Sequence, residues 1–180
     1  MVKYKRVKHY HEPGDVHELT FSCYDHMPLL TNDTWRGHLA ESIDTACRQH
    51  AFRLVAFVFM PEHVHLLTLP EGPEPDLGHF IAAVKRPVSA KVKSYLAVSN
   101  SRLLERLTVR ERAGKSAFRY WQEGPGYDRN LQRDESVLFE RLALEIMQAG
   151  LSWELVLKRR EGMRLNQDRP DRLRIFVLIG

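Results

Sequence analysis

The sequence predicts an α+β fold, in which an antiparallel sheet carries helices on one face. Three observations lead to this prediction. Short segments rich in β-branched and aromatic residues are continuously apolar or alternate apolar and polar positions, as strands do. The longer segments between them place apolar residues at helical spacing. The chain has 180 residues, of which 43% are hydrophobic, and this is enough for one domain with a buried core and an appendage.

The first half of the chain contains three expected strands and one helix. The alternating HELTFSCY ends at Met27-Pro28, and Met60-Pro61-Glu62 forms a turn between the apolar runs FRLVAFVF and HVHLLTL. An Asx side chain before the helix can cap its first turn. The expected elements are a strand over residues 17–24, a helix from Asn32 or Asp33 to about His50, and strands over residues 52–59 and 63–69.

The second half adds helices and a fourth strand. The expected elements are a helix from about Asp76 to Val98 with an irregularity at Pro87, a charged helix over residues 101–112, a strand over residues 117–122, helices over residues 134–149 and 152–160, and a final RIFVLI that is either a short strand or an unanchored apolar end. The order strand–helix–strand–strand–helix–strand over residues 17–122 is that of a ferredoxin-like sandwich. The sheet of that fold leaves one face available for a ligand.

The excess positive charge is concentrated in two zones. Residues 83–119 carry ten Lys and Arg side chains against two Glu, and residues 156–174 carry seven basic against three acidic side chains. The formal net charge of the whole chain is only +4, so the remainder is neutral to acidic. Two basic zones on such a body suit a polyanion partner. A solvated helix face is the alternative interpretation.

Composition also excludes several protein classes. No apolar run approaches the roughly 20 residues of a membrane span. The N-terminal residues lack the apolar centre of a secretory signal. Cys23 and Cys47 are too few for a disulfide scaffold and fit two buried thiols in a reducing compartment. We therefore expect a cytoplasmic protein.

His63-Val64-His65 is the segment richest in chemistry. On a strand, residues two apart project from the same face, so both imidazoles point one way while Val64 enters the core. Two such imidazoles can hold one divalent ion if a third ligand comes from elsewhere, and the open coordination positions suit catalysis. Two surface histidines without a metal are the alternative.

The stretch FRLVAFVFMPEHVHLLTLP resembles the His-hydrophobe-His (HUH) strand of single-tyrosine transposases, the insertion-sequence and REP-associated tyrosine transposases. LTFSCYDHMPLLTND, AVKRPVSAKVKSYL and FRYWQEGPGYDRN are similar to further segments of this family, in the family's order. The resemblance covers about residues 4–130. It implies a ferredoxin-like fold, in agreement with the element order.

The resemblance implies cleavage and joining of single-stranded or hairpin DNA. In this family, two histidines bind Mg²⁺ or Mn²⁺ at the scissile phosphate, and a helix tyrosine attacks to form a 5′-phosphotyrosine link. Residue by residue, it makes His63 and His65 the metal ligands. The resemblance also implies that four basic side chains contact the DNA backbone: Lys85, Arg86, Lys91 and Lys93. A homodimer is a further expectation.

The chain departs from the family at the nucleophile. The family carries its tyrosine on a helix soon after the YDRN-like segment, whereas here no tyrosine follows Tyr127. We therefore expect impaired strand cleavage. Tyr127, after a Gly-Pro-Gly bend, is the candidate replacement, while Tyr120 is expected to pack or to stack on bases and Tyr95 to lie in the core. Candidates for the third metal ligand are Glu62, expected to point away from the histidines, and Gln148.

Residues 134–164 instead resemble an N-terminal helix pair of DNA-3-methyladenine glycosylase I. That resemblance implies roles for Glu145 and Trp153 in a base pocket, but one helix pair cannot enclose a flipped base. We expect three segments: a transposase-like domain over residues 1–130, a helical glycosylase-like fragment over residues 131–164, and a tail over residues 165–180. The alternatives to a transposase-type enzyme are a non-catalytic DNA-hairpin-binding protein and a glycosylase remnant.

Overall fold

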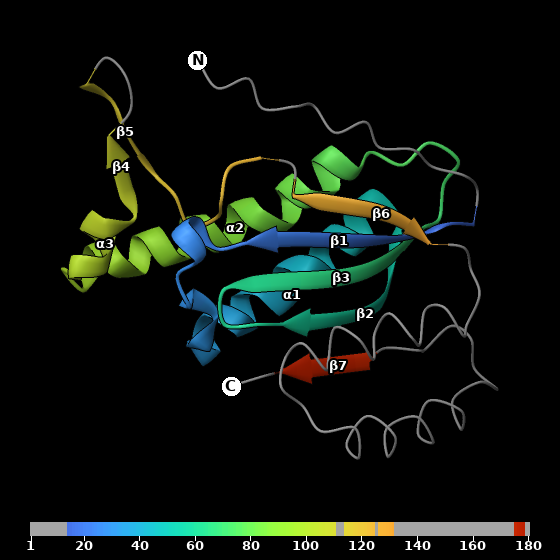
Figure 1. Ribbon diagram of the computed structural model, residues 1–180, viewed down its shortest axis with the longest axis horizontal. Coiled ribbons are helices and arrows are strands. Elements are labelled where there is room, and N and C mark those ends of the chain that lie inside the picture. The colour runs from blue at the N-terminus through green and yellow to red at the C-terminus, as the bar shows by residue number, and fades with distance from the viewer. Residues whose placement is uncertain (1–13, 111–113, 125, 132–174, 179–180) are drawn as a thin grey trace.

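Two helices cover one face of a five-stranded sheet (Figure 1). The computed structural model describes residues 14–110, 114–124, 126–131 and 175–178. The elements in chain order are β1 (Val16–Ser22), η1 (Tyr24–His26), η2 (Leu29–Thr31), α1 (Asp33–His50), β2 (Phe52–Phe59), β3 (His63–Pro70), α2 (Leu77–Val98), α3 (Arg102–Arg106), β4 (Thr108–Arg110), β5 (Ser116–Phe118), β6 (Tyr127–Leu131) and β7 (Ile175–Leu178). Within the described residues, no helix combines the length and the apolar character that crossing a bilayer requires.

The strand order is β6-β1-β3-β2-β7. The first four strands are antiparallel neighbours, and β7 pairs with β2 in parallel. Together with α1 and α2, these four strands give the connectivity and strand order of a ferredoxin-like sandwich, so the predicted α+β fold is confirmed. The C-terminal apolar residues form a strand rather than an unanchored end.

The predicted fourth strand was wrong. Residues 117–122 do not join the sheet as a strand: β5 pairs with β4 in a separate two-stranded ribbon, and residues 119–122 run past the end of β1. The sheet takes its fourth antiparallel strand from β6 instead. The charged helix predicted over residues 101–112 is limited to α3, because the chain after Leu107 turns into β4. The helices predicted over residues 134–149 and 152–160 lie outside the described residues.

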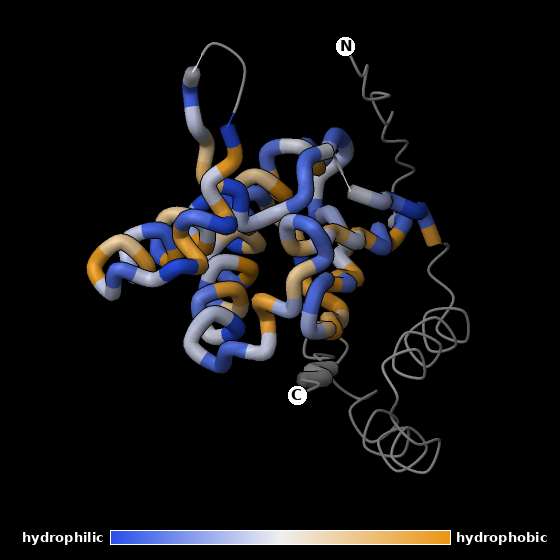
Figure 2. The backbone as a smooth tube through the Cα atoms, turned by 60° about the vertical axis from the view of Figure 1, so that its left-hand side comes forward, coloured by the Kyte–Doolittle hydropathy of each residue, from blue (hydrophilic) through white to orange (hydrophobic). Residues whose placement is uncertain are grey.

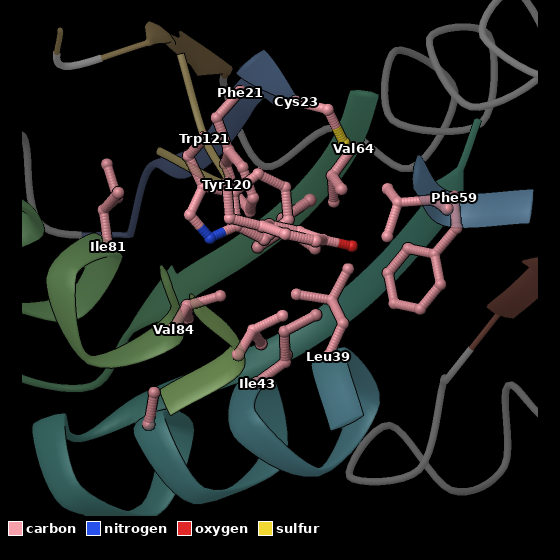
Figure 3. Packing of buried hydrophobic residues seen from close by; sticks show 14 of the residues in the cluster. Phe21, Cys23, Leu39, Ile43, Phe59, Val64, Ile81, Val84, Tyr120 and Trp121 are labelled. Atoms are coloured by element: carbon pink, nitrogen blue, oxygen red, sulfur yellow. The ribbon is translucent and has the colours of Figure 1, made fainter. Parts of the chain in front are cut away.

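The core lies between the sheet and the two helices. One side of β1 and β3 supplies Phe21 and Val64, which pack with Leu39 of α1 and Val84 of α2 (Figure 3). Figure 2 shows the same division along the chain, with hydrophobic positions recurring within the helices and strands and hydrophilic ones between them. Cys23 and Cys47 are both buried thiols, as the composition predicted. The helices therefore cover one face of the sheet, which we call the helix face.

Each of the two long helices, α1 and α2, begins at an Asx cap. The Asn32 side chain accepts a hydrogen bond from the Trp35 N–H (3.1 Å), and the Asp76 side chain accepts one from the His79 N–H (2.8 Å). The α1 helix ends at Ala51, which has a left-handed backbone (φ 54°). The α2 helix continues through Pro87 without a break.

Candidate functional site

Burial divides the other face of the sheet, away from α1 and α2, into two halves. Because successive side chains of a strand point to opposite faces, every residue next to a core-facing one on a strand points to this second face. At one end of the face, Val16, Glu18, Leu67 and Leu69 are buried. At the other end, the side chains of β1, β3 and β6 are partly or fully exposed; we call this group the histidine patch, and it consists of Thr20, Ser22, His63, His65 and Tyr127.

The two histidines of the patch lie side by side, as the alternation predicted. Their ring centroids are 4.8 Å apart and the ring planes are inclined by 74°. His63 Nδ1 is 2.9 Å from Glu62 Oε1, and His65 Nδ1 is 3.1 Å from Thr20 Oγ1. Each ring is therefore oriented through Nδ1 by a neighbouring oxygen.

His65 is held in its neutral form. Burial of the ring is the main cause that lowers the pKa of His65 to about 4, and the charge of the adjacent His63 lowers it further. At neutral pH its imidazole therefore carries no charge, and neutral imidazole is the form that binds metal ions.

The residues present fit part of a metal site. A carboxylate on the second nitrogen of a metal-binding histidine is a common supporting contact, and Glu62 has this position on His63. Glu62 does not point away from the histidines, so that expectation was wrong. Within the described ranges, no three His, Cys, Asp or Glu side chains are grouped to hold one ion. The other predicted third ligand, Gln148, lies outside the described residues.

Tyr127 belongs to the same patch through strand register. Tyr127 of β6 is the Cα partner of Thr20 in β1, which is the partner of His65 in β3. These three residues form one row across the sheet, and two strand spacings, roughly 10 Å in all, separate the outer Cα atoms. The Tyr127 side chain is 55% exposed. The structure thus brings the predicted nucleophile and the predicted metal ligands to one surface.

Gly126 allows β6 to begin this close to β1. Its φ is +76°, and a Cβ built on it would lie 2.4 Å from the Thr20 carbonyl oxygen. Only glycine adopts this backbone and this approach without strain. Thr20 was not singled out in the sequence, and Gly126 was noted only as part of the Gly-Pro-Gly bend, because the contact between them depends on which strand pairs with which.

The other two tyrosines considered lie elsewhere. Tyr120 is 1% exposed and packs edge-on against Trp35, so it is packed, as one of its two interpretations predicted, and is not a platform for bases. Among the described residues, its buried hydroxyl has no hydrogen-bond partner. Tyr95 is 61% exposed on α2, so its predicted core position was wrong.

The predicted DNA contacts of α2 are not gathered at the histidine patch. Because α2 packs on the helix face, its side chains and the two histidines lie on opposite sides of the sheet. Lys85 Nζ lies 4.9 Å above the Phe21 ring, where burial lowers the pKa of Lys85 to about 8. Lys91 forms an ion pair with Glu41 (2.8 Å), and Arg86 and Lys93 are exposed.

Two family models match parts of the chain. The model described as "Transposase IS200 like" matches residues 16–124, which is more than half of the chain. The model described as "Methyladenine glycosylase" matches residues 114–175. The first range contains both histidines, and the second contains Tyr127 and all of β6. No curated protein matches the chain.

Two solved structures are similar to the chain at low sequence identity. A REP-associated tyrosine transposase bound to a REP hairpin is 20% identical, with a TM-score of 0.48 over 78% of this chain and 68% of that one. A Deinococcus radiodurans R1 protein assigned to the transposases is 18% identical, with a TM-score of 0.46 over 81% of this chain and 97% of that one.

Proposed function

We propose a DNA-processing function from one premise: this chain belongs to the IS200-like transposase family, whose model matches more than half of it. Transposases of this kind generally use a divalent metal ion. We propose that the chain binds single-stranded or hairpin DNA with a scissile phosphate over the histidine patch. His63 and His65 would hold Mg²⁺ or Mn²⁺ there, and Tyr127 would be the nucleophile of a weakened strand cleavage.

One observation carries this proposal. Two imidazoles, each oriented through Nδ1, share a partly exposed surface with an exposed phenol, and strand register fixes all three. When bound, the ion would offset negative charge on the phosphate oxygens. Thr20 and Glu62 would keep the two rings in position. Tyr127 would present its phenol from the neighbouring side of the same face.

The step conserves phosphodiester bonds. The Tyr127 phenol oxygen forms a bond to phosphorus as the bond from phosphorus to the 3′-oxygen breaks. The leaving 3′-oxygen takes the electron pair, and the proton given up by the phenol balances the one gained by the new 3′-hydroxyl. The product is a 5′-phosphotyrosine link that a strand end can later reverse. We propose that the yield is low because the family's helix tyrosine has no counterpart after Tyr127.

Labelled hairpin DNA and Mn²⁺ test the proposal. A small amount of covalent adduct is expected with the wild type and none with Tyr127→Phe, whereas Tyr95→Phe, which removes another exposed phenol, should leave the adduct unchanged. His63→Ala and His65→Ala should abolish the adduct and any metal-dependent part of DNA binding. An adduct that persists in Tyr127→Phe would overturn the assignment. Hairpin binding without any adduct would establish the non-catalytic alternative.

A base-excision activity is not proposed, although a glycosylase model matches residues 114–175. Glu145 and Trp153, the two residues that this resemblance singles out, lie outside the described residues. We expect no release of 3-methyladenine from alkylated DNA. The cytoplasmic location, the homodimer and the division into three segments stay predictions.

A further inference from the structure

We propose that a basic arm beside the histidine patch contacts the phosphates of a duplex stem while the patch holds the scissile strand. The arm consists of α3, β4 and β5, and it carries Arg102, Arg106, Arg110 and Lys115. All four belong to the basic zone over residues 83–119, but none of them was singled out as a DNA contact from the sequence. The inference rests on the proposed function, since it concerns the same DNA.

The exposed charge of the arm is mainly positive. All four basic side chains are exposed, and none belongs to an ion pair among the described residues. Glu105 is the single acidic residue in the described stretches 102–110 and 114–118. Figure 2 shows the two strands of the arm projecting from the body with hydrophilic ends. Such a surface suits a polyanion rather than an apolar protein partner.

The arm is anchored firmly at its base. Leu107 and Tyr120 are buried, and the Arg119 N–H donates to the Leu107 carbonyl (2.7 Å). The Trp121 indole N–H donates to the Lys85 carbonyl of α2 (3.0 Å). These contacts fix the ribbon to the body, so its charges are held in position before any DNA binds.

The anchor lies next to the histidine patch. The Gln122 N–H donates to the Ser22 carbonyl (2.9 Å), and the Tyr24 N–H donates to the Tyr120 carbonyl (2.9 Å). Ser22 is the register partner of His63. The arm therefore projects from the end of the sheet at which β1 ends and β3 begins (Figure 1). The exposed residues of α2 do not lie next to the histidine patch, because α2 packs on the opposite face of the sheet.

The length of the arm predicts where it meets the DNA. Lys115 lies five residues before Tyr120, which is at most about 17 Å of extended chain. A duplex rises about 3.4 Å per base pair, so this reach corresponds to about five base pairs. A stem much shorter than this cannot touch the end of the arm.

Binding to hairpins with stems of about 12 and about 3 base pairs tests the proposal. For the long stem, Arg110→Gln combined with Lys115→Gln should weaken binding by up to about 30-fold at 0.15 M salt and lower the slope of log K against log salt by up to about 1.8, because each phosphate contact adds about 0.9 to that slope. For the short stem, the same variant should bind like the wild type. Anisotropy titrations over a salt series measure both quantities.

The controls separate this proposal from the proposed function. Arg48→Gln removes an exposed arginine on α1, away from the arm, and should have a smaller effect than Arg110→Gln alone. The arm proposal would be overturned if the double variant lost the same affinity for both stems, or lost none for either. It would also be overturned if the variant changed its oligomeric state while the slope of log K against log salt stayed the same. None of these results alters the Mn²⁺-dependent adduct of the wild type, which tests the histidine patch separately.

Discussion

At the scale of single residues, Gly126 controls where Tyr127 lies. Gly126→Ala adds a backbone penalty at φ +76° and places a Cβ against the Thr20 carbonyl, so β6 must shift away from β1. We expect a loss of more than about 2 kcal/mol in the free energy of unfolding, together with loss of the Tyr127 adduct. Urea denaturation and the adduct assay measure the two effects.

Gly114→Ala is the matched control for that substitution. Gly114 has a similar φ of +77°, but a Cβ there meets nothing within 4 Å. It should therefore show only the backbone penalty, about 1 to 2 kcal/mol. If the two variants lost the same stability, the close approach to Thr20 would have no energetic importance.

Lys85 makes stability depend on pH. Burial lowers the pKa of Lys85 to about 8 from its ordinary value of 10.5, so between these pH values the unfolded chain binds more protons than the folded chain. The contribution of this group to stability therefore rises with pH over that interval. Lys85→Met should stabilise the protein most below pH 8, and the gain should shrink towards pH 10. Urea midpoints of both proteins at pH 7 and pH 10 measure it. A gain that grew with pH would contradict the buried placement.

At the scale of elements, Ser42 compensates for the proline inside α2. Pro87 has no N–H to donate to the Ala83 carbonyl. Ser42 of α1 donates instead to the carbonyls of Ala83 (3.2 Å) and Val84 (2.8 Å). We expect Ser42→Ala to cost about 1 to 3 kcal/mol, because it leaves buried carbonyls without this donor. Denaturant unfolding measures the loss.

A double-mutant cycle distinguishes this role from simple packing. Pro87→Ala restores an N–H for the Ala83 carbonyl, so Ser42→Ala should cost less in that background. Ser89→Ala is the control on the same helix: Ser89 donates to the Lys85 carbonyl, which also accepts from Trp121, and its loss should stay within about 0.5 kcal/mol. Equal costs of Ser42→Ala in both backgrounds would rule out compensation.

The elements that could be predicted are those whose pattern follows from their own burial. Three strands and two long helices carry alternating or helical apolar spacing, and the structure has all five near their predicted positions. The fourth strand, YDRNL, pairs with β1, and Leu131 is its one buried residue. A strand with so little burial does not need apolar residues, so its mostly polar sequence showed no strand pattern. The more apolar AFRYWQ instead supplies the buried base of the arm.

Only the part of the site that lies within one strand could be predicted from the sequence. The common face of His63 and His65 follows from the period of a strand. The row from Tyr127 through Thr20 to His65 depends on the pairing of three strands that are far apart in sequence. The position of α2 on the opposite face of the sheet likewise results from packing. The sequence therefore predicted the basic residues of α2 but not their separation from the histidines.

At the scale of the whole molecule, the chain completes its sheet with residues beyond the transposase match. That match ends at residue 124, while β6 pairs with β1 over five positions within the glycosylase match. The pairing also buries a hydrogen bond between His17 Nδ1 and Asp128 Oδ1 (3.0 Å). The sheet is thus shared between two segments with different family matches.

This sharing predicts that the transposase-matched part does not fold well alone. A chain ending at Glu123 leaves β1 as an edge strand and removes Asp128 from the buried His17. A chain ending at Leu131 keeps both. We expect the shorter chain to aggregate and to unfold at a lower temperature, because unpaired edges promote association and the buried His17 loses one of its partners. Soluble yield and thermal unfolding compare the two. Equal behaviour of the two chains would show that β6 is not needed for folding and would contradict this prediction.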